Sequence, residues 1–263
     1  MKMRAPKSIE AAVKRILPGT SRSARKIRRQ IGAGHSPTLG FLHIPKTGGS
    51  GVNELGRELV KQGEPFPCNF SHAWTVAEIR ERYPRMRIAL LLRDPLERTI
   101  SGFNSRLRQG RPTYHRMWSP EEAVVFALFP DVTRYLDALL SDDEWSLSAR
   151  AFAQKHVSHL RRNYRYYFRS PRKVGEQADA IALVGRVEDT EAFIEALLVE
   201  AGIPAARVAG LYRRRHEAPA PTASVLERYS PSDNAKLRAR LGDEYRIYDA
   251  LVGLAAKGRP RAA

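Results

Sequence analysis

Two segments of the chain share one pattern, in which an apolar run ends at a polar turn and then passes into a helical pattern. The first is Phe41-Leu-His-Ile-Pro-Lys-Thr-Gly-Gly-Ser-Gly51, and the second is Leu90-Leu-Leu-Arg-Asp-Pro-Leu-Glu-Arg-Thr-Ile-Ser101. Strands that alternate with helices in this way predict a parallel sheet with right-handed crossovers. We therefore expect a single α/β domain with a central parallel sheet flanked by helices.

The first turn has the composition of an anion-binding loop. Residues 38–44 predict a short buried strand, and a helix is predicted from Ser50 onward. The glycines between them let the backbone approach an anion closely, and N–H groups at a helix start point at it. Thr47 and Ser50 add hydroxyl donors, and Lys46 adds a mobile charge. The order differs from a Walker A loop, because the lysine precedes the glycines. An ordinary glycine-rich turn is the alternative.

The second turn adds an arginine to the end of a strand. Residues 87–92 are continuously apolar after Arg87, as expected for a parallel strand covered on both faces. Arg93 follows directly and can bind a phosphate bidentately. Ser101 lies about two helical turns further on, and Arg98 is expected to form a surface ion pair with a neighbouring carboxylate. A charged helix start without a ligand is the alternative.

Together the two segments resemble the nucleotide-binding loops of carbohydrate sulfotransferases that use 3′-phosphoadenosine 5′-phosphosulfate (PAPS). That family includes the heparan sulfate 2-O- and 6-O-sulfotransferases and bacterial relatives, and the resemblance implies their P-loop NTPase-like fold. It also implies that Lys46 contacts the leaving phosphate oxygen, while Arg93 and Ser101 hold the 3′-phosphate. The resemblance assigns the 5′-phosphosulfate to the rest of the first loop: Thr47, Gly48, Gly49, Ser50 and Gly51.

A third segment, Ser71-His-Ala-Trp-Thr-Val76, is similar to the histidine-containing segment of the 6-O enzymes, where the histidine is the proposed general base. A sugar hydroxyl must lose its proton as it attacks sulfur, and a histidine suits that task. His72 is therefore the candidate catalytic base beside Lys46. The alternative is a histidine that caps the helix starting near Thr75, or a structural one. His43 is expected to pack or to support the loop.

Three other residues are the next candidates for the general base if His72 does not have that role. They are Glu54, His115 and His216.

The resemblance extends weakly to residues 181–190 and 230–251, so that it covers roughly residues 38–251. We interpret residues 1–36 as a basic flexible tail, 37–255 as the sulfotransferase domain and 256–263 as a flexible tail. Residues 161–169 alternate arginines with aromatics, which favours an amphipathic helix with buried rings. Helical patterns are also predicted at 75–83, 96–108, 120–128, 132–140 and 148–160.

The chain of 263 residues carries a net charge of +17, of which residues 1–36 supply +9 through ten Lys and Arg and one Glu. Such a surface fits an anionic nucleotide and an anionic glycan. Charge alone also fits nucleic acid or an anionic membrane. No specific nucleic-acid partner is expected, and peripheral membrane contact through the basic N-terminus stays open.

Cys68 is the only cysteine, so an intrachain disulfide is excluded and a reducing compartment is favoured. The sequence has no apolar stretch near the ~20 residues needed to span a bilayer, and its N-terminus lacks the apolar region of a signal peptide. A cytoplasmic location is the resulting expectation.

The sequence thus favours a PAPS-dependent sulfotransferase that sulfates a hydroxyl group, with a carbohydrate as the leading acceptor class. No metal-ligand cluster is visible, and none is expected to be required. Two alternatives stay open: a small-molecule kinase that uses the same loops on ATP, and a non-enzymatic basic nucleic-acid-binding protein. The acceptor and the oligomeric state are open at this point.

Overall fold

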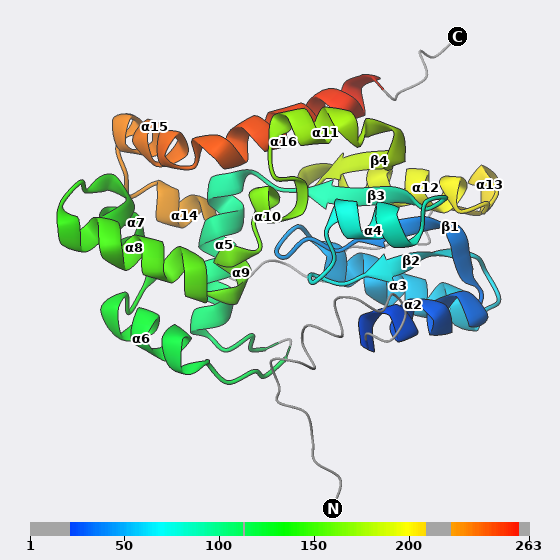
Figure 1. The fold of residues 1–263 in the computed structure, drawn as a ribbon, viewed down its shortest axis with the longest axis horizontal. Coiled ribbons are helices and arrows are strands. Elements are labelled where there is room, and N and C mark those ends of the chain that lie inside the picture. Colours follow the sequence, from blue (N-terminus) through cyan, green and yellow to red (C-terminus); the bar gives the residue numbers. More distant parts are fainter. Residues whose placement is uncertain (1–21, 113, 209–221, 258–263) are drawn as a thin grey trace, which may run out of the picture.

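The core of the molecule is a parallel sheet, seen in a computed structural model that describes residues 22–112, 114–208 and 222–257. Four parallel strands lie in the order β2-β1-β3-β4 and are flanked by helices (Figure 1). Their bounds are β1 His35–Leu42, β2 Phe66–Phe70, β3 Arg87–Leu92 and β4 Ile181–Arg186. The prediction of an α/β fold with a central parallel sheet is confirmed.

The strand β2 is the one element of the sheet that the sequence pattern does not predict. Its residues include Pro67 and Asn69, which interrupt the apolar run. The position of β2 at the edge of the sheet explains why the proline is tolerated, since an edge strand leaves one row of backbone groups unpaired.

Strand β1 has β2 on one side and β3 on the other. The connection after β1 therefore leads to β2 on one side of β1, and the connection after β2 leads to β3 on the other side. This reversal creates a topological switch point between β1 and β3. Leu42 of β1 pairs with Leu90 of β3, so the segments that follow the two strands emerge side by side. Ligands of open parallel sheets bind at such a switch point, outside the carboxyl ends of the strands.

Helices cover both faces of the sheet, and the alternation of side chains along each strand explains how. Phe41 and Leu91 point to the face covered by α3 (Gly49–Lys61) and α12 (Thr190–Glu200). Leu42 and Leu90 point to the opposite face. That face is covered by α2 Arg22–Gly32, α4 Val76–Arg82, α10 Tyr164–Phe168, α11 Pro171–Glu176 and α16 Gly242–Lys257.

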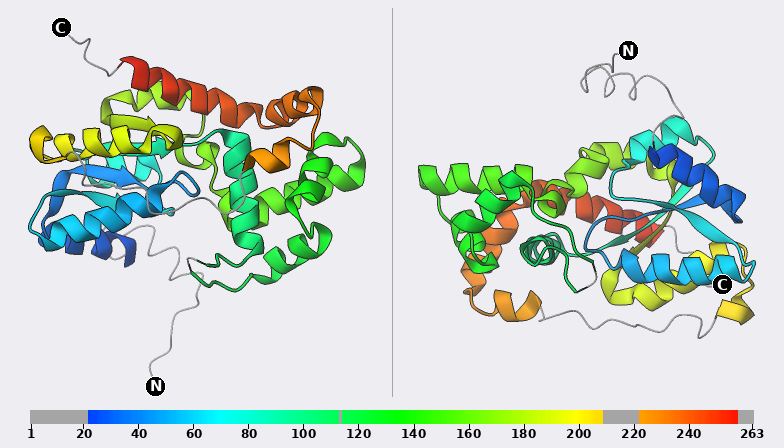
Figure 2. Two further views of the ribbon diagram at one scale, coloured as in Figure 1. Left: turned by 180° about the vertical axis from the view of Figure 1, so that it is seen from behind. Right: turned by 90° about the horizontal axis from the view of Figure 1, so that it is seen from below.

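A second group of helices, here called the helical lobe, stands beyond the carboxyl edge of the sheet. The arrowheads of β2 and β3 point toward it (Figures 1 and 2). Its helices share a core of their own, built around Phe103, Tyr135 and Leu136. The helical lobe consists of α5 Pro95–Leu107, α6 Pro120–Leu128, α7 Val132–Leu140, α8 Glu144–His156, α9 Ser158–Arg161, α14 Thr222–Leu226 and α15 Pro231–Arg240.

The arginine–aromatic run joins the helical lobe to the sheet. It is divided between the end of α9 and α10 and does not form the single helix predicted, although its aromatic rings are largely buried as expected. Tyr164, Tyr167 and Phe168 are buried against the sheet, whereas Arg161 and Arg165 are exposed. The remaining short elements are η1 Ala178–Ala180, η2 Val187–Asp189 and α13 Ala205–Val208.

The domain boundaries differ from those expected. Part of the segment interpreted as a flexible tail, residues 1–36, forms α2, because Ile27 of this helix is buried in the core beside the sheet. β1 begins at His35 and ends at Leu42, so Ile44 belongs to the following loop. At the other end α16 continues to Lys257, past the expected boundary at 255. The expectations for residues 1–21 and 258–263 lie outside the described residues.

Among the described residues, no helix has the length and apolar character needed to cross a membrane.

Candidate active site

The loop after β1 makes a sharp turn onto the start of α3. Lys46 has φ = 69° and Gly48 has φ = 79°, so both adopt the left-handed conformation, which is uncommon for a lysine. Gly48 is the N-cap residue of α3, and no side chain caps this helix start. Because the first N–H groups of a helix have no intrahelical acceptor, those of Gly49 and Ser50 are left for water or a ligand.

Two contacts fix the shape of this loop. The Thr47 hydroxyl donates to the carbonyl oxygen of Ile44 at 3.0 Å, so Thr47 holds the turn together and its hydroxyl proton is already engaged. Gly49 packs against the ring of His43, and a Cβ atom at Gly49 would lie 2.2 Å from His43 Cδ2. His43 in turn accepts at Nδ1 from the Asn53 side-chain amide at 2.9 Å. His43 therefore supports the loop, as its place in the sequence suggests.

Lys46 is a cation in unfavourable surroundings. Burial, and then the positive charges of Arg108 and Arg93, lower the pKa of Lys46 from its usual value to about 8. Lys46 also lowers the pKa of three histidines, namely His43, His72 and His159. Lys46, Arg93 and Arg108 therefore form one cluster with the three histidines beyond the carboxyl ends of β1 and β3, and the positive charge of this cluster comes from the lysine and the two arginines. An anion bound there would relieve the repulsion.

Arg93 directly follows β3 and is held from two sides. Its Nε lies 3.2 Å from a carboxylate oxygen of Glu97. Its backbone N–H donates to the Tyr164 hydroxyl at 2.9 Å, and that hydroxyl donates to the Arg93 carbonyl at 2.6 Å. Tyr164 thus clamps the strand end. Ser101 lies further along α5 and is half-buried.

His72 lies in the connection between β2 and α4, beside the first loop. Its Nδ1 is 2.6 Å from the carbonyl oxygen of His43, and the two rings are 4.4 Å apart. A carbonyl can only accept, so Nδ1 carries the proton and Nε2 keeps its lone pair. Burial lowers the pKa of His72, the bond to His43 raises it, and Arg162 and Lys46 lower it, with a net lowering. The ring is therefore neutral near pH 7.

The structure contradicts the alternative in which His72 caps α4. Thr75 is the N-cap residue, and its hydroxyl accepts from the Glu78 backbone N–H at 3.2 Å. The Glu78 carboxylate accepts a hydrogen bond from the Thr75 backbone N–H at 2.8 Å, which completes a capping box.

A third histidine, which the sequence does not single out, completes the cluster. His159 of α9 comes from the helical lobe, and its ring lies 6.1 Å from that of His72. Burial, and then Lys46 and His72, lower the pKa of His159 to about 2. Nothing in its neighbourhood of the sequence marks it, since it is one histidine at the start of a short helix. Only the packing of the helical lobe against the sheet edge brings it to His72.

Arg98 is not the surface residue that the sequence suggests. It is 1% exposed, because its face of α5 is turned into the protein. Its Nη1 donates to the carbonyl oxygens of His159 at 3.1 Å and of Arg162 at 3.4 Å. Its Nη2 lies 3.9 Å from Glu244, which is also buried. Arg98 therefore fixes the backbone that carries His159.

The three alternative bases lie on α3, in the loop after α5 and outside the described residues. His115 is exposed, with Nε2 2.9 Å from the Gln109 side-chain oxygen. Glu54 is part of α3. His216 belongs to a segment outside the described residues. In the described ranges, no group of three or more His, Cys, Asp or Glu residues is arranged to hold a metal ion.

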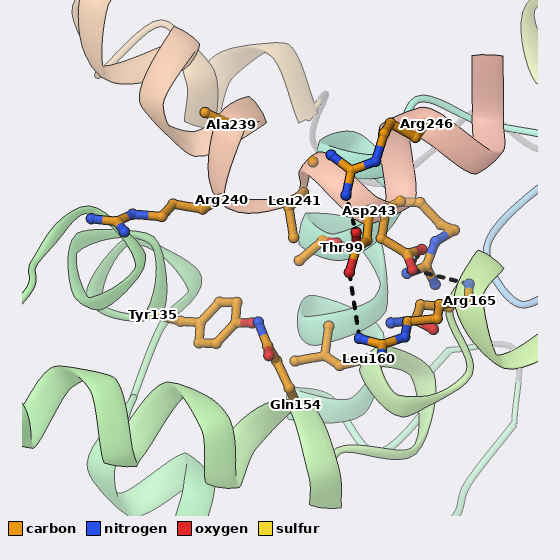
Figure 3. A pocket seen from close by; sticks show the side chains of 14 residues that line it. Thr99, Tyr135, Gln154, Leu160, Arg165, Ala239, Arg240, Leu241, Asp243 and Arg246 are labelled. Atoms are coloured by element: carbon orange, nitrogen blue, oxygen red, sulfur yellow. Dashed lines mark hydrogen bonds and ion pairs between the residues drawn. The ribbon is translucent and has the colours of Figure 1, made fainter. Parts of the chain in front are cut away.

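A polar cavity of about 370 Å³ lies elsewhere, between α5 and the α15–α16 corner (Figure 3). Its charged side chains are largely paired, as Figure 3 shows for Arg165 and Arg246, which both contact Asp243. None of the cluster residues Lys46, His72 and Arg93 lines this cavity. The candidate catalytic and anion-binding groups therefore lie beyond the carboxyl ends of the central strands and not in the cavity.

Comparison of the chain with models of known protein families, with curated proteins and with solved structures finds no match.

Proposed function

We propose that the protein transfers the sulfuryl group of PAPS to a hydroxyl group, with a carbohydrate as the leading acceptor class. The observation that carries this proposal is the positively charged cluster at the switch point between β1 and β3. There burial, Arg108 and Arg93 destabilise the charged form of Lys46, which lies just before the start of α3, a helix start that no side chain caps. Such a site suits a ligand with two separate anionic groups. We also propose that the sheet is the core of a P-loop-like sulfotransferase fold.

Each of the two loops would bind a different anionic group of the nucleotide. The loop of residues 46–51 would hold the 5′-phosphosulfate through backbone N–H groups at the start of α3. Arg93 would hold the 3′-phosphate with its guanidinium group. The backbone of Arg93 at the end of β3 is fixed by two hydrogen bonds to the Tyr164 hydroxyl. Ser101 would add a hydroxyl donor from α5.

The proposed transfer proceeds in line, with His72 as the base. The acceptor oxygen attacks sulfur while His72 Nε2 takes the hydroxyl proton. A new O–S bond forms, and the bond between sulfur and the bridging phosphate oxygen breaks. Its electron pair stays on that phosphate oxygen, where Lys46 and the loop N–H groups stabilise the charge. The products are a sulfate ester and adenosine 3′,5′-bisphosphate (PAP), and the imidazolium of His72 then releases its proton to water.

The carboxylate beside the second loop argues against the kinase alternative. A kinase would use a strand-end acid to bind Mg²⁺. Asp94 instead caps α5 by accepting from the backbone N–H of Leu96 at 3.0 Å, and it pairs with Arg238 at 2.6 Å. Its oxygens also contact the Tyr245 hydroxyl at 2.9 Å. This carboxylate is therefore committed within the fold. The nucleic-acid alternative is supported by charge alone.

Nucleotide preference tests the proposal without knowledge of the acceptor. We expect PAP to raise the melting temperature of the full chain far more than AMP, ADP or Mg²⁺-ATP at equal concentration, because a ligand that binds the native state stabilises it by mass action. Isothermal titration calorimetry would give the corresponding dissociation constants. Radiolabelled PAPS incubated with a panel of glycans and small alcohols would then identify the acceptor.

A matched control lies at the other end of the same strand. Arg87 begins β3, is exposed and pairs with Glu200 at 2.5 Å. Arg87→Ala should leave the PAP response intact, whereas Arg93→Ala should remove most of it. Equal shifts from PAP and ADP would reject the sulfotransferase proposal and favour the kinase. Steeply salt-dependent DNA or RNA binding without any PAP response would favour the nucleic-acid alternative.

A further inference from the structure

His159 is a buried polar side chain with one ring nitrogen that has no partner in the described part of the chain. The residue is 8% exposed, and its Nδ1 is buried without a hydrogen-bond partner among the described residues. Buried polar groups are nearly always paired, so such a group calls for an explanation. The ring lies edge-on to the ring of His72, with 6.1 Å between the ring centres, and is close enough to Lys46 for that cation to lower its pKa. It therefore borders the space in which Lys46 and His72 would meet a ligand.

The segment that carries His159 is fixed on both sides. Arg98 Nη1 donates to the His159 carbonyl at 3.1 Å, and the Glu122 carboxylate accepts from the preceding Ser158 N–H at 3.1 Å. Both Arg98 and Glu122 are buried. The α9 backbone also lies against Gly102 of α5, where an added Cβ would be 3.2 Å from His159 Cβ. This fixed backbone limits the positions that the imidazole can take, as required of a group that recognises a reacting atom.

The surroundings also indicate which ring nitrogen is the donor. An N–H group without an acceptor is costlier to bury than a bare lone pair, so the closed-off Nδ1 is the unprotonated nitrogen. Nε2 then carries the proton. Because burial and the nearby charge of Lys46 lower the pKa of His159 to about 2, the ring is neutral near pH 7. It can donate a hydrogen bond, but it cannot act as a cation or as an effective base.

We propose that His159 is a catalytic residue whose Nε2–H donates a hydrogen bond to a non-bridging oxygen of the sulfuryl group during transfer. This inference rests on the proposed sulfotransferase function. His72 and His159 then have separate tasks. His72 removes the proton of the attacking hydroxyl, while His159 orients the sulfuryl group and carries no net charge. No atom is transferred to or from His159.

Affinity for PAPS and for PAP, measured by calorimetry, separates this role from a structural one, because the two ligands differ by the sulfuryl group. We expect His159→Phe to weaken PAPS binding about 10-fold, the effect of losing a hydrogen bond to a charged group, and to leave PAP binding unchanged. Transfer should fall by at least the same factor. His115→Phe, which alters an exposed histidine, should change neither affinity.

Two amide variants make the test specific for the ring nitrogen. The amide of glutamine reaches the position of Nε2, so His159→Gln should restore PAPS affinity and transfer. The amide of asparagine reaches the position of Nδ1, so His159→Asn should behave like the phenylalanine variant. The inference would be overturned by equal losses for PAPS and PAP, by no loss, or by rescue with asparagine. If wild-type protein does not prefer PAP to ADP, the proposed function itself fails.

Discussion

The Nδ1 atom of His72 lies 2.6 Å from the carbonyl oxygen of His43, in the loop that also carries Lys46. This bond joins the β2–α4 connection to the loop after β1 and sets the tautomer of His72. The tautomer leaves Nε2 as the basic nitrogen, which is the requirement for a general base. The position of the candidate base is thus determined by the same loop that would bind the phosphosulfate.

A variant that keeps this bond but removes the base tests the role of His72. Asparagine places an amide donor near the position of Nδ1, so His72→Asn should retain the contact with His43 and the melting temperature of wild type. Loss of Nε2 should lower turnover about 10²–10⁴-fold at unchanged PAP affinity. Steady-state kinetics and thermal denaturation would measure both. Normal turnover would place the base elsewhere, whereas activity lost in parallel with stability would indicate a structural histidine.

The pKa shifts predict a bell-shaped pH dependence of kcat/KM. His72 must be neutral, and its pKa is lowered, so activity should fall only below about pH 6.5. Lys46 must be charged, and its pKa is about 8, so activity should also fall as pH rises through about 8. The charged groups that act on this pair are Arg93, Arg108 and Arg162. Rates between pH 5 and 10 would define both limbs, within the range in which wild type stays folded.

The control for this profile is Lys46→Arg, because a guanidinium stays charged throughout this range. The variant should lose the alkaline limb and keep the acid one. An alkaline limb that persists in Lys46→Arg would assign it to another group.

Replacement of Lys46 and replacement of Arg93 should affect different kinetic constants. Arg93 would contact a phosphate whose charge is constant during reaction, so Arg93→Ala should raise KM for PAPS with little change in kcat. Lys46 would meet charge that develops as the bond to sulfur breaks, so Lys46→Ala should mainly lower kcat. Steady-state kinetics of both variants, beside Arg87→Ala, would test the assignment. Near-normal kcat in Lys46→Ala would refute the role of that lysine.

The sequence predicts the parts of the site that are local and misses those that come from packing. The loops at residues 46–51 and at Arg93 follow from strand-like runs that end in polar turns, and the parallel sheet follows from their alternation with helices. Two errors have a common cause. Arg98 looks exposed and His159 looks incidental, because the helical lobe that buries both contacts the sheet edge only in the folded chain.

The edge strand β2 shows a different limit. Pro67 and Asn69 interrupt its apolar pattern, although their neighbours Phe66, Cys68 and Phe70 are buried. An edge strand needs fewer backbone hydrogen bonds, so it tolerates residues that argue against a central strand. The boundary of the N-terminal segment differs from the predicted one for a related reason, since the mainly basic α2 has few apolar residues but buries Ile27.

The close packing of Gly49 makes the loop sensitive to a single methyl group. A Cβ atom at Gly49 would lie 2.2 Å from the His43 ring, so Gly49→Ala must move His43 or the start of α3. We expect PAP affinity to fall at least 10-fold, because the N–H groups that would bind the phosphate shift by a fraction of an ångström. Gly175→Ala in α11 is the control, since a Cβ there meets nothing within 4 Å. Calorimetry that shows equal PAP affinity in both variants would contradict the assignment of this loop.

The buried pair of Arg106 and Glu122 should support both the fold and the position of His159. Arg106 donates to both Glu122 oxygens, from Nε at 2.9 Å and from Nη2 at 2.6 Å, and Glu122 also accepts from the Ser158 N–H. Burial raises the pKa of Glu122, but the hydrogen bonds from Arg106, Ser158 and Ser119 outweigh it and lower the pKa to about 2. A lowered pKa means that this contribution to stability is complete above the ordinary glutamate range and is lost as pH falls toward 2.

Replacing Glu122 by Gln removes the charge but keeps the size of the side chain. We expect Glu122→Gln to lower the free energy of unfolding by about 3 kcal/mol, because it leaves the Arg106 guanidinium buried without its partner. The variant should also lose part of the acid-dependent decline in stability that wild type shows below about pH 4.5. Urea denaturation at pH 3, 5 and 7 would measure both effects. An exposed carboxylate variant, Glu144→Gln, serves as control and should change stability by less than about 0.5 kcal/mol. If Glu122→Gln matches this control, the pair does not anchor α9, and His159 must be held by Arg98 alone.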